Sequence, residues 1–214
     1  IKTAEAVSPS ILWIDEIEKG FGNNNNGDSG TSTRILGTFL TWMQEKNKPV
    51  FVVATANNIN NLPPELLRKG RFDEIFFVDL PTKKERVDIF KLHLNKRLKD
   101  EKVKSSINVD EELLNNLADL TEGFVGAEIE HIVVSGLFEA FYEERGLTYY
   151  DLEKAIHSTV PLSVTQAEQI IGIRTWASTR AVAATSRNER KEYNNFTEES
   201  SDIIASRGGR AIDF

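Results

Sequence analysis

Two consecutive acidic residues, Asp15 and Glu16, directly follow the apolar run of residues 11–14. A carboxylate at the end of a buried strand can hold Mg²⁺ through its water shell, and a second carboxylate beside it can polarise the water that attacks a γ-phosphate. The alternative is that both acids only mark the end of the strand or cap the next helix. Because acidic side chains are seldom buried, their position after so apolar a run favours the chemical interpretation.

Polar groups also follow the next apolar segments. Asn57 and Asn58 come shortly after residues 50–54, and an uncharged amide beside a catalytic carboxylate could orient the attacking water without perturbing its charge. Arg68 and Arg71 lie three residues apart near the end of a short predicted helix, and their guanidinium groups suit phosphate oxygens. Taken separately, an Asn-rich turn and a solvated basic turn are the simpler explanations. The acidic pair, the asparagines and the arginines occur in a fixed order after successive segments. Together they therefore favour phosphate chemistry more strongly than each does alone.

This order resembles the AAA family of ring-forming ATPases, and residues 66–73 match the family pattern L-L-R-x-G-R-F-D at every specified position. The resemblance implies that Asp15 is the Mg²⁺-associated acid and Glu16 the general base. It implies that Asn57 is the water-orienting sensor, because its spacing from Arg68 fits better than that of the neighbouring asparagine. Arg68 and Arg71 would be arginine fingers that reach the nucleotide of a neighbouring subunit. The resemblance therefore implies ATP and Mg²⁺ as cofactors and a homo-oligomeric, head-to-tail ring, expected to be a hexamer.

The helical part of the sequence continues the resemblance. Ile89 and His93 are four residues apart and would share one helix face, and Gly126 and Ala127 stand where a later helix is expected to begin. In the AAA family these places contact the adenosine, so the resemblance implies that all four residues bind the nucleotide. By itself, His93 could equally be a satisfied surface imidazole.

A narrower resemblance extends over most of the chain. Residues 11–21, 62–81 and 161–165 and the terminal Arg207-Gly-Gly-Arg segment are similar to an AAA subgroup encoded by cyanobacteria and by algal plastid genomes. This similarity implies a location in the plastid stroma or the cyanobacterial cytoplasm. The resemblance implies that the polar segment of residues 20–31 is a pore-facing loop of the family, but after Phe21 this segment contains no aromatic residue that could grip a threaded substrate.

Composition excludes several classes of protein. The 214 residues carry a net charge of −7, which argues against a broad nucleic-acid footprint, so nucleic-acid binding is not expected. The absence of cysteine excludes disulfides and thiolate metal sites. No apolar run is long enough to cross a membrane as a helix. The composition is that of an ordinary globular domain.

The hydrophobic pattern predicts an α/β core followed by helices. Strands are expected near residues 11–14, 50–54 and 74–78, the first of them buried on both faces, with a helix over residues 35–43 between the first two. We predict a parallel-sheet nucleotide-binding domain of the P-loop NTPase (AAA) type over residues 1–80 and an all-helical lid over 81–160. A C-terminal helix is expected within 161–185, at about residues 165–184, and a disordered tail over 186–214.

The Gly-rich phosphate loop G-x-x-x-x-G-K-[ST] is missing from the sequence, which contains no Gly-Lys dipeptide. The chain is therefore expected to be the second half of an AAA ATPase, which folds poorly and lacks useful ATP affinity without that loop. The alternative is a non-enzymatic interaction module from a truncated or split AAA protein, with an unknown protein partner. Nucleic-acid binding through the Arg207-Gly-Gly-Arg segment is a third and weaker alternative.

Overall fold

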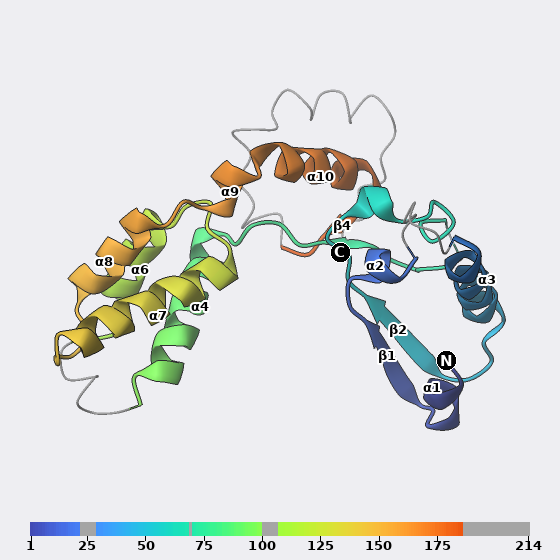
Figure 1. The fold of residues 1–214 in the computed structure, drawn as a ribbon, viewed down its shortest axis with the longest axis horizontal. Helices are drawn as coiled ribbons and strands as arrows, with labels where there is room; N and C mark the ends of the chain where they lie inside the picture. The colour runs from blue at the N-terminus through green and yellow to red at the C-terminus, as the bar shows by residue number, and fades with distance from the viewer. Residues whose placement is uncertain (22–28, 69, 100–106, 186–214) are drawn as a thin grey trace. The chain divides into compact units, whose positions relative to one another are not determined.

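The structure is a computed structural model that describes residues 1–21, 29–68, 70–99 and 107–185. The chain divides into two compact units, Ile1–Ile75 and a second one that begins at Phe76. Figure 1 labels most of the helices and strands of both. The predicted disordered tail and most of the predicted pore-facing loop lie outside the described residues.

The first unit contains two parallel strands and the helices that follow them. β1 (Ser10–Ile14) pairs with β2 (Val50–Ala54) in parallel, and Ile14 lies opposite Ala54. α1 (Lys2–Ala6) precedes β1, α2 (Ile17–Phe21) and α3 (Ser29–Glu45) connect the strands, and the 3₁₀ helix η1 (Ile59–Asn61) follows β2. The strands and the 35–43 helix predicted from the sequence are confirmed. However, α3 begins within the segment predicted as a loop.

One face of the β1–β2 pair is buried. Its core contains the buried side chains of α2, α3 and the turn after η1, with half-buried residues of both strands packed against them; the fully buried members are Ile17, Phe39, Leu40, Met43 and Leu66. On the other face, Ile11, Trp13 and Phe51 are 72%, 61% and 66% exposed. The prediction that the strand of residues 11–14 is buried on both faces is therefore wrong, because its alternate side chains Ile11 and Trp13 face solvent.

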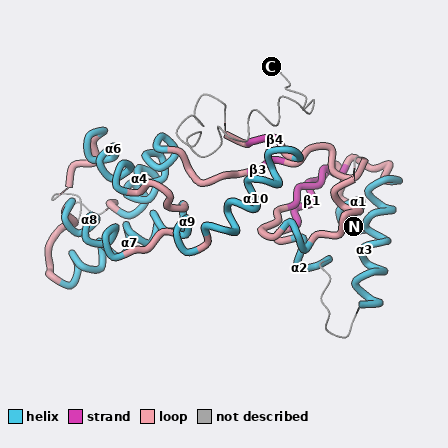
Figure 2. Tube along the Cα trace, turned by 90° about the horizontal axis from the view of Figure 1, so that it is seen from above, coloured by secondary structure: helices cyan, strands magenta, loops and turns pink. Residues whose placement is uncertain are grey.

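The second unit is mainly helical, as predicted. Its helices are α4 (Lys83–Arg97), α6 (Glu111–Leu120), α7 (Gly126–Tyr142), α8 (Tyr149–Ser158), α9 (Leu162–Thr165) and α10 (Ala167–Arg180). The first four form a bundle around one apolar core, which includes Phe90, Leu117, Ile132 and Leu152 (Figure 2). Gly136 lets α7 approach α8, since a Cβ there would lie 3.0 Å from Leu152 Cδ2. A capping box of Thr82 and Glu85 starts α4.

The C-terminal region differs from the single predicted helix. Besides α9 and α10 it contains the strand β4 (Val182–Ala183), which pairs in parallel with β3 (Phe76–Phe77). Arg174 on α10 donates from Nε to both carboxylate oxygens of Asp79, at 2.9 and 3.0 Å. These contacts fix the C-terminal segment against the chain that precedes α4. The predicted third strand is thus only two residues long and pairs with β4, because a polar Asp79 and the exposed Val78 follow it directly.

A buried ion pair holds the start of α8. Asp151, which is 2% exposed, accepts hydrogen bonds from Arg145 Nη1 and Nη2 (both 2.6 Å) and from the backbone and hydroxyl of Thr148. The hydrogen bonds from Arg145, supported by those from Thr148, lower the pKa of Asp151 from its ordinary 3.8 to about 2. Since the folded state favours the carboxylate, its contribution to stability is complete above the ordinary pKa and is lost as the pH falls through about 2.

We expect Asp151→Asn to lower the free energy of unfolding at pH 7 by about 2 kcal/mol, because the depressed pKa corresponds to a loss of that order. Denaturant unfolding followed by circular dichroism at pH 7 and at pH 2 measures the effect, and the difference between variant and wild type should shrink at the lower pH. Asp88→Asn, on the exposed surface of α4, is the control. An equal loss at both pH values would contradict the role assigned to the ion pair.

Candidate functional site

The parallel pairing of β1 and β2 brings the acidic residues beside the end of the next strand. Thr55 N–H donates to Ile14 O and Ile17 N–H donates to Thr55 O, each at 2.9 Å, so the pairing continues past the strand ends. The Thr55 hydroxyl donates to Asp15 Oδ1 at 2.5 Å and accepts the Glu16 backbone N–H at 3.0 Å. Both predicted acids are therefore anchored to the end of β2.

The Glu16 carboxylate makes two polar contacts. Its Oε1 accepts a hydrogen bond from Asn57 Nδ2 at 3.0 Å, and its Oε2 pairs with Lys19 Nζ at 2.5 Å. The hydrogen bond and charge of Glu16 raise the pKa of Lys19, which lies on the surface. Asn58 instead directs its Oδ1 to the backbone N–H of Asn60 and caps η1. The geometry thus brings Asn57, and not Asn58, next to Glu16.

Glu18 holds the loop that carries Asn57. The side chain is buried, with 7% exposed, and its Oε1 accepts the backbone N–H groups of Asn57 and Asn58 at 3.0 and 3.3 Å. Its Oε2 is buried without a hydrogen-bond partner among the residues that the structure describes. Two hydrogen bonds to a carboxylate restrain this backbone more strongly than neutral acceptors would. Sequence reasoning missed Glu18, because a glutamate on a short helix resembles any surface acid.

The two arginines have different surroundings. Arg68 is exposed at the end of the turn that contains the buried Leu66, whereas Arg71 is half-buried and donates from Nη1 to Leu40 O at 2.9 Å. Gly70 lies between them with a φ of +87°, a conformation that residues with a Cβ rarely adopt. Arg68 therefore lies at the surface of its unit, whereas Arg71 fixes this turn to α3.

The residues predicted to bind adenosine lie in the second unit. A Cβ on Gly126 would be 3.7 Å from Ile89 Cδ1, so the start of α7 lies against this face of α4. His93 is on the same helix as Ile89, and its Nδ1 lies within hydrogen-bond distance of Arg97 Nη1, at 3.1 Å. Ala127 is exposed at the start of α7. The structure therefore brings Ile89 and Gly126 together and leaves His93 half-buried beside Arg97.

Glu130 adds charge to this part of the lid. It accepts a hydrogen bond from Arg97 Nη2 at 2.6 Å and lies 3.5 Å from His93 Nδ1. The hydrogen bond from Arg97 is the main cause of the lowered pKa of Glu130. Sequence reasoning did not single out Arg97 or Glu130, although their spacing from His93 and Gly126 is helical.

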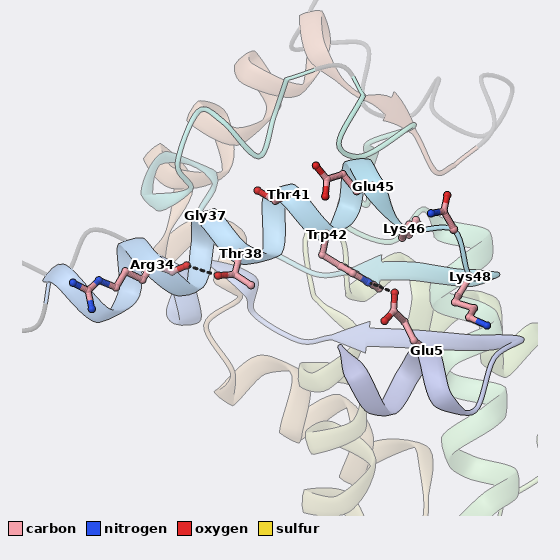
Figure 3. Close-up of a pocket in the computed structure, with 10 residues that line it drawn as sticks. Glu5, Arg34, Gly37, Thr38, Thr41, Trp42, Glu45, Lys46 and Lys48 are labelled. Carbon is pink, nitrogen blue, oxygen red and sulfur yellow. Dashed lines mark hydrogen bonds between the residues drawn. The ribbon is translucent and has the colours of Figure 1, made fainter.

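One groove of the first unit lies away from the predicted catalytic residues. It has a volume of about 940 Å³ and runs along α3, where Trp42 Nε1 donates to Glu5 Oε1 at 2.8 Å (Figure 3). Arg34 and Lys48 also line it. None of the residues predicted to act on a nucleotide lines this groove, so its size does not identify the candidate site.

The carboxylates of Asp15 and Glu16 at the end of β1 are oxygen ligands of the kind that Mg²⁺ prefers. The described residues contain no cluster of three or more His, Cys, Asp or Glu side chains that could enclose a metal. Mg²⁺ bound with a nucleotide needs no such cage, because it uses one or two carboxylates, water and phosphate oxygens. Asp15 at the strand end, with Glu16 beside it, fits Mg²⁺ held in this way.

Comparison with known proteins identifies related sequences. Residues 1–80 match the sequence profile of the ATPase family associated with various cellular activities (AAA). The chain is 50% identical over 178 residues to the AAA domain-containing protein ycf46 of Pyropia yezoensis, covering 83% of this chain and 35% of that protein. It is 34% identical over 163 residues to the proteasome-activating nucleotidase of Archaeoglobus fulgidus, covering 73% of this chain and 39% of the relative. The chain thus spans little more than a third of these relatives.

The fold agrees with the sequence relationship. The crystal structure of the FIGL-1 AAA domain in complex with ADP superposes with a TM-score of 0.67, at 19% identity, over 84% of this chain and 61% of that one. The expected fold, an AAA-type α/β core followed by helices, is confirmed. No helix among the described residues has the length and apolar character needed to span a bilayer. Residues 1–80 are therefore part of an AAA-family domain, and the chain is a relative of AAA domain-containing proteins such as ycf46 of Pyropia yezoensis.

Proposed function

We propose that this chain supplies the water-activating and adenosine-binding parts of an ATPase that hydrolyses the β–γ phosphoanhydride bond of ATP. The observation that carries the proposal is the contact between Asn57 Nδ2 and Glu16 Oε1 beside the anchored Asp15. An amide and two carboxylates at the ends of adjacent parallel strands form the arrangement that water activation at a phosphate requires. The family and its ATPase relatives support this reading.

Each residue has a separate part in the proposed reaction. Glu16 accepts the proton of the attacking water, and Asn57 holds Glu16 and the water in line. Asp15 would hold Mg²⁺, which supplies positive charge to the phosphate oxygens when bound. Arg68 and Arg71 would stabilise the charge that develops on the phosphate of a neighbouring subunit. Ile89, His93, Gly126 and Ala127 would contact the adenosine.

The proposal includes an assembly and a location. Arginine fingers act between subunits, so the ATPase would be a homo-oligomeric ring, with a hexamer as the expected form, that works on an unidentified protein. Its domains would be a nucleotide-binding part over residues 1–80, a lid over 81–160 and a C-terminal segment over 161–185. The plastid relatives support a plastid stroma or cyanobacterial cytoplasm as the compartment.

The experiment compares nucleotide binding and ATP hydrolysis by these 214 residues and by a longer form with a G-x-x-x-x-G-K-[ST] loop upstream of residue 1. We expect activity only in the longer form, because backbone amides and a lysine of that loop hold the β- and γ-phosphates. If neither form binds ATP, the proposal fails. The exposed apolar face of Ile11, Trp13 and Phe51 would then favour the second candidate, a non-enzymatic interaction module.

A further inference from the structure

The hydroxyl of Thr55 joins the two strand ends that carry the candidate site. It donates its hydrogen to Asp15 Oδ1 at 2.5 Å and accepts the backbone N–H of Glu16 at 3.0 Å. A hydroxyl has one hydrogen to donate and two lone pairs that accept, so both bonds form at once. The register of β1 and β2 places Thr55 beside Asp15. Ile14 lies opposite Ala54, and Asp15 and Thr55 are the residues that follow them.

The bond to Asp15 fixes one carboxylate oxygen. Oδ1 is engaged by Thr55, and no described residue donates a hydrogen bond to Oδ2. The carboxylate therefore has a fixed orientation with one oxygen facing away from the bond. Outer groups that orient a metal-binding carboxylate commonly change metal affinity when they are removed.

The bond to Glu16 supports an unusual backbone conformation. Glu16 has a φ of +47°, in the left-handed region that residues with a Cβ rarely adopt. The hydrogen bond from its N–H to Thr55 holds the chain in this conformation. From there, the Glu16 side chain reaches Asn57 Nδ2 at 3.0 Å. Thr55 thus acts on the general base through the backbone and on the metal-binding acid through its side chain.

We propose that Thr55 is a positioning residue that sets the orientation of Asp15 for Mg²⁺ and of Glu16 for water activation. The proposal rests on the function proposed above for these two acids. A serine in this place retains both hydrogen bonds. A valine has nearly the same shape but can form neither, and it leaves the Glu16 N–H without its acceptor.

The test uses the longer form that carries the phosphate loop, with Thr55→Val and Thr55→Ser compared with wild type. The first readout is hydrogen exchange of the Glu16 amide by NMR without nucleotide. The second is the Mg²⁺ concentration at which binding of a fluorescent ATP analogue is half-complete. We expect Thr55→Val to speed the exchange and to raise this concentration about tenfold, whereas Thr55→Ser stays close to wild type. Thr38→Val, which removes an exposed hydroxyl on α3 bonded to Arg34 O, is the control.

The two readouts separate this proposal from the proposed function. If wild type does not bind the nucleotide, the proposed function fails, and faster Glu16 exchange in Thr55→Val still supports the positioning of the backbone. If Thr55→Val matches wild type in both exchange and Mg²⁺ dependence, the role of Thr55 is overturned. Should the valine variant not fold, Thr55→Ala, which also removes the hydroxyl, takes its place: faster exchange with a raised Mg²⁺ requirement supports the role, and wild-type behaviour overturns it.

Discussion

Replacing Arg68 by alanine is expected to lower the rate of ATP hydrolysis about a thousandfold in assembled rings, while nucleotide binding to each subunit stays unchanged. The magnitude is that of a guanidinium supplied to a phosphate from a neighbouring subunit, where it neutralises charge that appears only in the transition state. Arg68 is exposed at its turn and Arg71 is bonded to Leu40 O, so Arg68 has the greater freedom to act in this way.

The measurement is steady-state ATP hydrolysis by the longer form at concentrations above and below those at which it assembles. Arg68→Lys should recover little activity, because an ammonium lacks the planar pair of donors that matches phosphate oxygens. Arg34→Ala, at an exposed position on α3, is the control for loss of a surface arginine. A decrease confined to unassembled subunits would argue against action between neighbours.

Glu16→Gln is expected to lower kcat at least about a hundredfold and to leave ATP binding intact. Glutamine keeps the size of the side chain and its hydrogen bond with Asn57, but it cannot accept the proton of the attacking water. The pair with Lys19 is lost as well, although an exposed ion pair contributes little to stability.

Single-turnover hydrolysis and equilibrium binding of ATP, measured on the same preparation, distinguish the chemical step from binding. Glu45→Gln, which removes an exposed carboxylate at the end of α3, is the matched control. Retained turnover in the Glu16 variant would mean that another group activates the water and would overturn the assignment of the base. Equal losses of binding and turnover would point to a structural role instead.

Much of the local structure could be predicted because it depends on neighbouring residues. The β2 strand has the predicted bounds, and the helices of the second unit follow the expected apolar periodicity. The short β3 and its partner β4 could not be predicted. Their pairing joins residues more than a hundred positions apart, and no local pattern in either two-residue strand specifies the other.

For the candidate site, too, part of the arrangement follows from the sequence and part follows only from the tertiary structure. The sequence by itself determined that Asp15, Glu16 and Asn57 follow apolar strands, and the parallel arrangement of such strands is enough to bring their ends together. The tertiary structure alone decided that Thr55 bonds to Asp15 and Glu16, that Glu18 is buried beneath Asn57, and that Arg71 bonds to α3 while Arg68 remains exposed. These outcomes depend on the register of β1 against β2 and on the packing of α2 and α3, because a hydrogen bond requires its two groups to lie within about 3 Å of each other, which residue type alone does not specify.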